Sequence, residues 1–352
     1  MRFAFVVTNL AGGGAEKAVA KLAAALVARG HEARLVLLEN HIEHRPPAGV
    51  HLEVLADGPV SKGWLGRRRL AWRLKHWAYR QGPFDLIVST LPFADEVTAL
   101  AALPRHCCRI ANTLSAELAR LPPTKAARRR ARYRALYGSR PLIAVSAGVA
   151  DDLREGLGLD TRIVTIPNLF DSHAIRVAAA EPASGLPGRP YGIHVGRFAP
   201  QKRHDLLLEA WGRLEQAPLL VLLTAPDPAL TALIAARGLE GRVLVAGFQT
   251  NPYPWIAGAE LLVLCSDHEG LPNVLIESLL CGTPALSTDC PSGPAEILAA
   301  FPECLVPPGD AAALAAAMDR CLKHPPDPAR ADLSAYSPAA VAAAYERLAE
   351  GC

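Results

Sequence analysis

The segment Cys265–Glu296, CSDHEGLPNVLIESLLCGTPALSTDCPSGPAE, carries the most specific pattern in the chain. The apolar residues 261–264 before it predict a buried strand, and this strand leads into a loop that carries Glu269. The run Gly270-Leu271-Pro272 predicts a turn immediately after this carboxylate. The segment therefore begins as a strand, a loop and a tight turn.

A helix that follows the turn completes the pattern. Asn273 is placed to cap this helix over Val274–Cys281, since its short side chain can accept from the first free N–H groups. Glu277 lies one turn past Asn273 and eight positions after Glu269. The helix N-terminus offers unpaired N–H groups and a partial positive charge, which favour a phosphate. Because sugar hydroxyls need fixed carboxylate acceptors, the pattern predicts a nucleotide-diphosphate sugar as the ligand.

The spacing Glu269-x7-Glu277 within EGLPNVLIES, followed by Cys281-Gly282-Thr283-Pro284, resembles the signature of the retaining GT-B glycosyltransferases of family GT4. Two glutamates at this spacing alone are more often solvated carboxylates, but the Gly-Leu-Pro-Asn and Cys-Gly-Thr-Pro context makes the resemblance specific. It extends over nearly the whole chain, strongly after Tyr191 and more loosely before. The resemblance implies an α/β GT-B fold, with two Rossmann-like domains whose parallel sheets face a central cleft. It also implies donor contacts from Glu269, Gly270, Leu271, Pro272, Asn273 and Glu277.

Length and composition favour an ordinary two-domain α/β protein. The 352 residues exceed the size at which one core usually suffices, and 51% of them are hydrophobic. The net charge of +3 is too small to imply nucleic acid by itself. Eight cysteines occur without a CxxC pair, a zinc spacing or a secretion signal, which favours reduced thiols in a cytosolic protein. No apolar run reaches the length needed to span a bilayer.

The chain begins with a βαβ unit that has a glycine-rich first turn. A strand is predicted over Arg2–Thr8, a helix over Ala15–Arg29 and a second strand over Ala33–Leu38. Glycines in such a turn leave backbone N–H groups aimed at a phosphate. The resemblance implies that Gly13 and Gly14 approach the donor diphosphate or the acceptor.

A dinucleotide site is the competing interpretation of this turn. Glu39 stands where an acidic ribose ligand would end the second strand. However, Gly12 and Gly14 are followed by Lys17 at the position of the third glycine, so the fingerprint is incomplete. The incomplete pattern disfavours NAD or FAD.

Two basic runs occur in the first half of the chain. A helix over Gly63–Arg80 places basic residues on one stripe beside an apolar stripe; the basic ones are Arg69, Arg73, His76 and Arg80, and the apolar ones Leu70, Leu74 and Trp77. The second run, Lys125–Arg134, carries Lys125, Arg128 and Arg132 on one face. Such helices favour peripheral contact with an anionic membrane surface or an acidic glycolipid. The alternative is a solvated helix that packs its Leu/Trp face on the domain, and the absence of a groove-reading motif argues against nucleic acid.

A second cationic element opens the second half. The run Gly196–Asp205, GRFAPQKRHD, resembles the family element whose Arg and Lys hold the diphosphate, here Arg197 and Lys202. Two cations aimed at the departing diphosphate stabilise its charge most in the transition state. Phe248, after a predicted strand over Arg242–Ala246, is a candidate for stacking on the nucleobase, with a core role as the alternative.

Two absences in the sequence bear on the site. No Asp-x-Asp pair occurs, although transferases of the other major fold hold a divalent metal on such a pair. No metal cofactor is therefore expected, and a metal on Asp267 and Glu269 is the disfavoured alternative. Many GT4 members also carry a histidine in the loop after the strand Arg109–Asn112, which this chain lacks. The candidate substitutes are Asn112, Ser115 and Glu117.

The linker and the last helix define the expected domains. The Pro-, Gly- and Ala-rich segment Ala178–Pro190 is interpreted as the interdomain linker. It separates an acceptor-binding domain over 1–177 from a nucleotide-sugar-binding domain over 190–335. A final helix over about 338–352 is expected to pack back onto the N-terminal domain.

The resemblance implies transfer of a hexose or N-acetylhexosamine from a nucleotide-sugar, with UDP favoured over GDP and with retention of configuration. The implied acceptor is a membrane-associated glycan, such as lipopolysaccharide core or an undecaprenyl-linked oligosaccharide, reached from the cytoplasmic side. Arg197 and Lys202 would stabilise the diphosphate, Glu269 would hold sugar hydroxyls, and Glu277 would bind the ribose. Two alternatives stay open, which are a GT-B sugar-nucleotide epimerase and a non-catalytic sugar- or lipid-binding scaffold.

Overall fold

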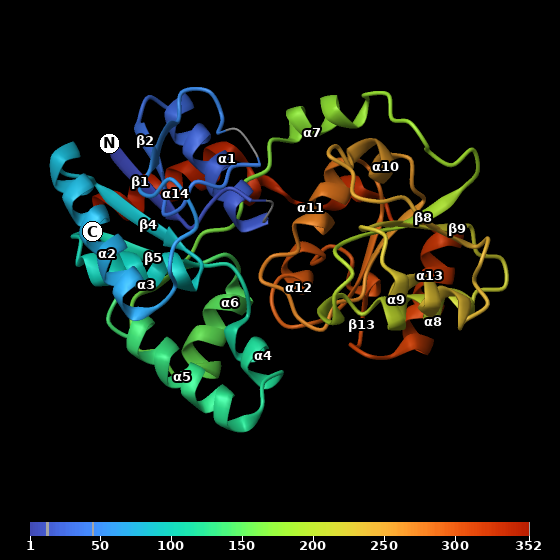
Figure 1. Cartoon of the computed structure of the whole chain (residues 1–352). Helices are drawn as coiled ribbons and strands as arrows, with labels where there is room; N and C mark the ends of the chain where they lie inside the picture. Colours follow the sequence, from blue (N-terminus) through green and yellow to red (C-terminus); the bar gives the residue numbers. More distant parts are fainter. Residues whose placement is uncertain (12–13, 44–45, 352) are drawn as a thin grey trace. The chain divides into compact units, whose positions relative to one another are not determined.

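The computed structural model describes residues 1–11, 14–43 and 46–351, which form two compact units (Figure 1). The first unit comprises Met1–Leu169 and Ala335–Cys352, and the second comprises Phe170–Ser334. The last helix of the chain therefore belongs to the same unit as the first strand.

The boundary between the units lies earlier than the sequence predicted. Helix α7 (Ser172–Ala179) belongs to the second unit, where it packs against α10 (Tyr253–Ala257). Ile175 of α7 is buried, and the Asn251 side chain donates to the Ala178 carbonyl at 2.8 Å. These contacts hold α7 and the start of the expected linker on the second unit, whereas the predicted first domain extended to residue 177.

The first unit is built on a parallel sheet, which within the described residues has seven strands in the order β3-β2-β1-β4-β5-β6-β7. Helices cover both faces of such a sheet, so its strands form continuous apolar runs. The strands are β1 (Arg2–Val7), β2 (Glu32–Leu37), β3 (His51–Val54), β4 (Leu86–Thr90), β5 (His106–Ile110), β6 (Leu142–Ala144) and β7 (Ile163–Thr165). The helices are α1 (Gly14–Ala28), α2 (Trp64–Gln81), α3 (Pro92–Ala101), α4 (Leu114–Ala119), α5 (Pro123–Tyr137), α6 (Ala147–Asp151) and α14 (Pro338–Glu350).

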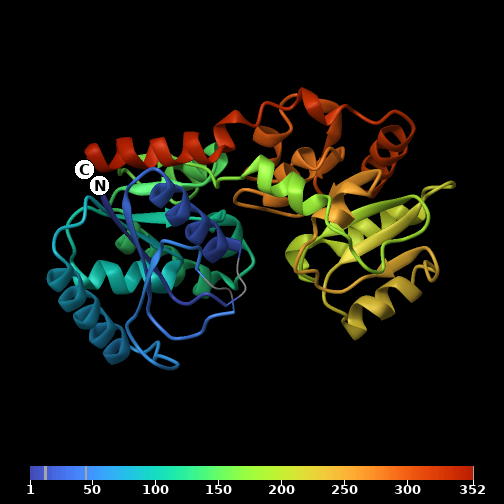
Figure 2. The same cartoon turned by 90° about the horizontal axis from the view of Figure 1, so that it is seen from above.

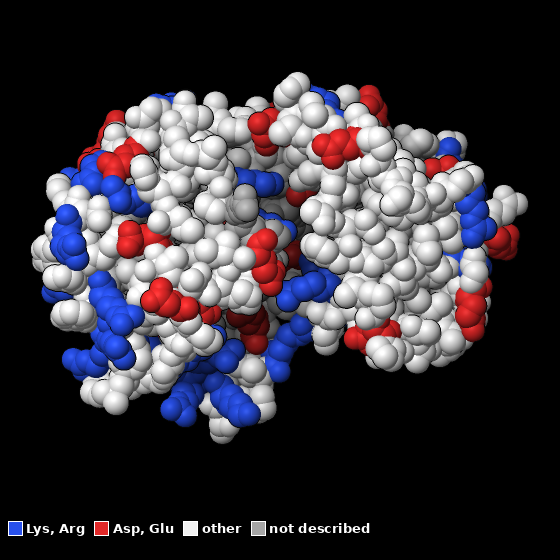
Figure 3. Space-filling model, turned by 45° about the horizontal axis from the view of Figure 1, so that its top comes forward, with Lys and Arg blue, Asp and Glu red and all other residues white. Residues whose placement is uncertain are grey.

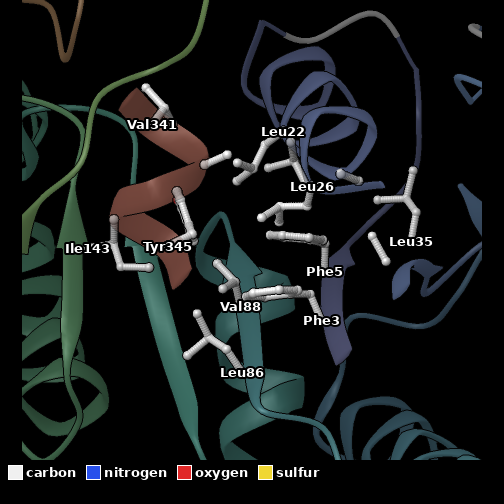
Figure 4. Close-up of a cluster of buried hydrophobic side chains, with 14 of the residues drawn as sticks. Phe3, Phe5, Leu22, Leu26, Leu35, Leu86, Val88, Ile143, Val341 and Tyr345 are labelled. Atoms are coloured by element: carbon white, nitrogen blue, oxygen red, sulfur yellow. The ribbon is translucent and has the colours of Figure 1, made fainter. Parts of the chain in front are cut away.

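Two hydrophobic clusters lie on the two faces of this sheet. On one face, Phe3 and Phe5 of β1 pack with Leu26 of α1 and with Tyr345 of α14 (Figure 4). The Phe5 and Tyr345 rings meet edge to face at a centroid distance of 6.3 Å. Figure 2 shows α14, in red, lying with α1 on this unit. On the other face, α2 and α3 cover the sheet through Leu70, Leu74, Trp77, Ala94 and Val97.

The second unit holds a parallel sheet of six strands within the described residues, in the order β10-β9-β8-β11-β12-β13. Its strands are β8 (Tyr191–Val195), β9 (Leu219–Leu223), β10 (Val243–Val245), β11 (Leu261–Leu264), β12 (Ala285–Thr288) and β13 (Leu305–Val306). Besides α7 and α10, its helices are α8 (His204–Gly212), α9 (Pro228–Ala235), α11 (Asn273–Leu280), α12 (Pro294–Ile297) and α13 (Ala311–Lys323). Both sheets thus have the strand order of a Rossmann fold, with a reversal next to their first strand.

In the part of the chain that the structure describes, no helix combines the length and the hydropathy needed to cross a membrane.

Candidate active site

The candidate site lies in the second unit, where the strand order reverses at β8. This strand sits between β9 and β11, so the chain leaves it in one direction and later returns on its other side. In open parallel α/β sheets, ligands bind outside the carboxyl ends of the strands at such a switch point. The loops after β8 and β11, residues 196–203 and 265–272, therefore define the place to examine.

An ion pair joins these two loops. Lys202 Nζ donates to Glu269 Oε1 at 2.6 Å, and the Ser266 hydroxyl donates to the same oxygen at 2.6 Å. The Lys202 and Glu269 side chains are only 20% and 10% exposed. The structure therefore brings a predicted cation and a predicted carboxylate into direct contact. Ser266 was not predicted as a site residue from the sequence, because a serine after a buried strand is common and does not by itself indicate a ligand contact.

Backbone and side-chain contacts fix the two loops against each other. Gln201 Nε2 donates to the His268 carbonyl at 2.5 Å, and the Asp267 N–H donates to the Gln201 carbonyl at 2.9 Å. Arg203 Nη1 donates to Asp267 Oδ1 at 2.9 Å. The hydrogen bonds that Arg203 donates to the Asp205 and Asp267 carboxylates raise the pKa of its guanidinium. These contacts hold Lys202 in register with Glu269.

Two neutral histidines lie beside Lys202. Burial lowers the pKa of His194 to about 3 and that of His204 to about 4, and the positive charge of Lys202 acts in the same direction. Their rings meet edge to face at a centroid distance of 4.7 Å. A Cβ at Gly196 would lie only 3.2 Å from His194 Nε2, whereas its 3.6 Å distance to the Lys202 stem is an ordinary contact, so glycine mainly leaves room for the His194 ring. The positive charge here is therefore concentrated on Lys202.

Arg197 follows β8 directly and is exposed. Among the residues that the structure describes, it forms no hydrogen bond and no ion pair. Its position in the same loop as Lys202 supplies a second cation at the switch point, available to a ligand. The structure thus keeps one predicted cation paired and the other unpaired.

The turn before α11 is tightly packed. Gly270, Leu271 and Pro272 are buried, and a Cβ at Gly293 would lie 2.4 Å from Pro272 Cδ. Because Gly293 also has a φ of +100°, only glycine fits at that position. The prediction that Asn273 caps the helix was wrong. Asn273 is the first helical residue, and Pro272, which occupies the cap position, makes no side-chain cap hydrogen bond to α11.

Glu277 and Phe248 are the two residues that the sequence predicted to contact the nucleoside. Glu277 of α11 accepts from the Tyr253 hydroxyl at 3.4 Å. Burial and the Glu277 carboxylate raise the pKa of Tyr253, so its phenol keeps its proton. Phe248 follows β10 and is 70% exposed, which rules out the core role that was its alternative. Tyr253 gave no signal in the sequence.

Two acidic residues of the loop after β11 are engaged with cations. Asp267 pairs with Arg203, and Glu269 pairs with Lys202. Over residues 1–11, 14–43 and 46–351, no three His, Cys, Asp or Glu side chains gather closely enough to hold a metal ion.

The predicted site residues of the first unit lie in the glycine-rich turn after β1, at the end of β2 and in the segment after β5. Gly13 lies outside the described residues, and Gly14 is the exposed first residue of α1. Glu39 accepts from Asn9 Nδ2 at 2.6 Å, which engages the carboxylate that a dinucleotide site would need. Of the substitutes for the missing histidine, Asn112 donates to Glu117 at 2.6 Å. Ser115 forms a hydrogen bond with Asp152, whose carboxylate also accepts from the N–H groups that start α4.

Comparison with known proteins matches both units to glycosyltransferases. Residues 12–174 match the family model described as Glycosyltransferase Family 4, and residues 189–324 match the model described as Glycosyl transferases group 1. A Rhizobium meliloti (strain 1021) protein, lipopolysaccharide core biosynthesis glycosyltransferase LpsE, is 26% identical over 284 residues, which are 78% of this chain and 76% of that protein.

A second relative matches over a shorter stretch. The Campylobacter jejuni N-acetylgalactosamine-N,N'-diacetylbacillosaminyl-diphospho-undecaprenol 4-alpha-N-acetylgalactosaminyltransferase is 41% identical over 107 residues, or 30% of this chain. The match spans 29% of the length of that protein.

The solved structure of Anabaena Alr3699/HepE in complex with UDP-glucose superposes with a TM-score of 0.73. The superposition covers 100% of this chain and 99% of that one at 20% identity. Likeness at this identity establishes the fold, and it confirms the predicted GT-B class with two Rossmann-like, parallel-sheet halves.

Proposed function

Because the chain belongs to family 4 of the glycosyltransferases, we propose that it moves a hexosyl or N-acetylhexosaminyl group from a nucleotide-sugar to a membrane-linked glycan. The observation that carries the proposal is the Lys202–Glu269 pair beside Arg197 at the switch point of the second unit. Cations and a carboxylate fixed at that edge suit a diphosphate joined to a sugar.

Each residue has a role in this proposal. The donor diphosphate competes with Glu269 for Lys202, and Arg197 contacts it as the second cation. Glu269 then accepts hydrogen bonds from the sugar hydroxyls, while Glu277 binds the ribose hydroxyls. The first N–H groups of α11 face the phosphates, which a helix N-terminus favours. Because two cations and a helix end offset the developing charge, the reaction needs no metal.

The proposed reaction retains the anomeric configuration. The bond between the anomeric carbon and the diphosphate oxygen breaks with its electron pair going to the diphosphate. The acceptor hydroxyl forms the new bond on the same face, and its proton passes to the departing diphosphate oxygen. Arg197 and Lys202 stabilise this charge most when the bond is nearly broken, which lowers the barrier.

UDP is the proposed nucleotide of the donor. Support comes from the general similarity of the C-terminal half to this family and from the HepE structure, whose title names UDP-glucose. The acceptor is proposed from the relatives. One is named for lipopolysaccharide core synthesis and another for an undecaprenol-linked glycan. These similarities favour a lipid-linked glycan at the inner face of the membrane.

An exposed face of α2 is consistent with the proposed membrane-linked acceptor. The predicted Leu70, Leu74 and Trp77 face is buried, as the packing alternative required. A second face is exposed, with Trp64, Leu65, Trp72 and Tyr79 between 65% and 74% accessible. The helix WLGRRRLAWRLKHWAYRQ contains no acidic residue. Exposed aromatics among basic side chains favour the interface of an anionic bilayer.

The basic residues predicted for this contact differ in availability. Arg69 and Arg80 of α2 and Lys125 and Arg128 of α5 are exposed. Figure 3 shows that Lys and Arg side chains gather on part of the molecular surface. Two others have partners inside the unit. Arg73 donates to the Leu55 carbonyl at 2.8 Å, and Arg132 pairs with Glu96 of α3. We therefore assign the proposed membrane contact to the four exposed cations and the aromatic face of α2.

Donor hydrolysis tests the function without a known acceptor. UDP- and GDP-sugars are incubated with the protein, and release of nucleotide is measured with and without EDTA. The proposal expects slow release from a UDP-hexose or UDP-N-acetylhexosamine that EDTA leaves unchanged. Conversion of the sugar without nucleotide release would instead identify an epimerase, and saturable UDP binding without turnover on any acceptor would favour a binding scaffold.

A further inference from the structure

A pocket in the first unit lies at the amino edge of its sheet, opposite the carboxyl ends of the strands. Its volume is about 540 Å³, which is the size of a small-ligand site. The lining comes from α3, from the residues that lead into β5, β6 and β7, and from the end of α14. Nothing in the proposed transfer reaction uses this edge.

Three arginines line the pocket. Arg105 directly precedes β5, Arg140 stands two residues before β6, and Arg162 directly precedes β7. These strands are neighbours in the sheet, and adjacent strands are about 4.8 Å apart, so the three positions span about 10 Å. No Asp or Glu occurs among the lining residues. The pocket therefore has a strongly positive wall.

Neutral groups hold two of these guanidiniums in place. Arg140 Nη1 donates to the Leu136 carbonyl at 2.8 Å and to Ser139 Oγ at 3.2 Å. Arg162 Nη1 donates to the Gly351 carbonyl at 2.9 Å. Within the described part of the chain, neither Arg140 nor Arg162 pairs with a carboxylate, and Arg105 has only a surface contact with Asp85 at 3.6 Å. Their positive charge is therefore largely uncompensated.

A buried histidine forms part of the wall. His106 is only 8% exposed, and its Nε2 lies 2.8 Å from Ser89 Oγ. Ser89 in turn donates to Asp95 at 2.5 Å, so the ring is fixed from behind. Burial and the charge of Arg140 lower the pKa of His106 to about 3, which keeps it neutral. The wall thus combines three cationic side chains with one buried neutral polar group.

We propose that Arg105, Arg140 and Arg162 form a binding site for a phosphate-bearing small ligand, separate from the candidate donor site. Guanidinium groups bind phosphate oxygens through two parallel hydrogen bonds, and each arginine here keeps nitrogens beyond the Nη1 that bonds the protein. A row of three guanidiniums suits a diphosphate or a sugar phosphate better than a single ion. Binding compensates the charge that the pocket now concentrates.

Inorganic pyrophosphate is the probe, measured by isothermal titration of the whole protein in the presence of saturating UDP. Arg140→Gln and Arg162→Gln are each expected to weaken binding about tenfold or more, because each removes a charge-assisted contact. Arg140→Lys keeps the charge and should lose less. Arg154→Gln is the matched control, since Arg154 is an exposed arginine of the same unit that pairs with Asp151 outside the pocket. Thermal unfolding of every variant verifies that it is folded.

Three results would overturn the proposal. One is no detectable binding up to about 10 mM pyrophosphate, and the second is equal affinity in the wild type and the pocket variants. The third is loss of binding in Arg197→Gln with full binding in Arg140→Gln, which would place the probe in the second unit. Binding of UDP is measured in a separate titration. If UDP does not bind, that result counts against the proposed donor site and not against the arginine pocket.

Vesicles containing phosphatidylglycerol distinguish the source of the phosphate. Release of the wild type from vesicles by pyrophosphate, but not of Arg140→Gln, would assign the pocket to a lipid headgroup. Unchanged vesicle binding together with pyrophosphate affinity would assign it to a soluble phosphate ester. Both outcomes support the pocket, and they differ only in the ligand that carries the phosphate.

Discussion

At the scale of single residues, the Lys202–Glu269 pair defines the state of the candidate site before a ligand arrives. Each partner compensates the other in a largely buried setting, where an unpaired charge is costly. In the proposed reaction, a donor diphosphate would offer Lys202 a more highly charged partner and would release the Glu269 carboxylate toward the sugar. Under this proposal the two cations differ in their ligand-free state, because Lys202 is paired with Glu269 and Arg197 has no such partner among the described residues.

The first prediction contrasts Arg197 and Glu277. Arg197→Ala should lower kcat about 100-fold, because the lost cation acts mainly on the departing diphosphate. Glu277→Ala should raise the donor KM about tenfold with a smaller effect on kcat, because ribose contacts are equal in the ground and transition states. Steady-state kinetics on the donor identified by hydrolysis measures both. Arg213→Ala, an exposed arginine paired with Glu209, is the control, and equal behaviour of all three variants would refute the assignments.

The second prediction concerns the buried carboxyl group of Asp95. Burial raises its pKa from 3.8 to about 7, although Ser89 and Tyr137 donate to it. The folded chain therefore holds a proton that the unfolded chain has lost, so this group lowers stability as the pH rises from about 4 to about 7. An Asn at this position has no charge to bury and still accepts from Tyr137.

Urea unfolding of the wild type and Asp95→Asn at pH 5 and pH 8 measures this effect. The variant should gain stability relative to the wild type between the two pH values. A stability difference that is the same at both pH values would show that Asp95 does not titrate in this range.

At the scale of elements, periodicity predicted helices but not the neighbours they pack against. The helix of the basic run was expected over Gly63–Arg80 and is found as α2, Trp64–Gln81. Its buried stripe contains Trp77, while Trp72 on the same helix is exposed. Ser146 caps α6, since its side chain accepts from the Val149 N–H at 3.2 Å. Caps of this kind are local, and so they follow from sequence more often than packing does.

The third prediction tests the packing of α14. Tyr345 is buried among Phe5 and the α1 side chains, so Tyr345→Ala should destabilise the first unit by about 3–5 kcal/mol. Its hydroxyl is buried and has no hydrogen-bond partner among the described residues. Tyr345→Phe should therefore stay within about 1 kcal/mol of the wild type, or exceed it. Chemical denaturation of both variants measures the difference, and a large loss in Tyr345→Phe would reveal a bond to the hydroxyl.

The fourth prediction tests the exposed face of α2. A double variant, Leu65→Ala with Trp72→Ala, should bind vesicles containing phosphatidylglycerol several-fold more weakly, because each side chain loses apolar area at the interface. Cosedimentation at fixed salt measures it. Leu100→Ala, which removes an exposed leucine from α3, should bind as the wild type does. Unchanged binding of the double variant would exclude this face as the contact.

At the scale of the whole molecule, the chain forms two Rossmann-like units, and the second is one continuous segment, Phe170–Ser334. The first unit depends on α14 from the far end of the chain. Apart from Gly14, the candidate donor residues that the structure describes all lie in the second unit. The basic helices α2 and α5 and the arginine pocket lie in the first unit. This division separates donor binding from the proposed membrane and phosphate contacts.

The fifth prediction follows from this division. UDP should slow amide hydrogen exchange most in residues 196–203 and 265–280, where the loops and α11 meet the phosphates. Pyrophosphate added with UDP should instead protect the amino edge of β5, β6 and β7. Mass spectrometry of proteolytic peptides resolves the two regions. Protection by UDP centred on the first unit would contradict the placement of the donor.

The sequence by itself determined several strands and helices, because apolar periodicity is local in the chain, and the Glu269-x7-Glu277 context gave the family resemblance, which implied the two parallel sheets. The catalytic roles of those residues stay predictions. Tertiary structure alone decided that Lys202 meets Glu269 across 67 positions, that α7 joins the second unit, and that Asn273 begins a helix instead of capping it. Such outcomes depend on which surfaces pack together, and that is set by the sum of many distant contacts that no short pattern of residues contains.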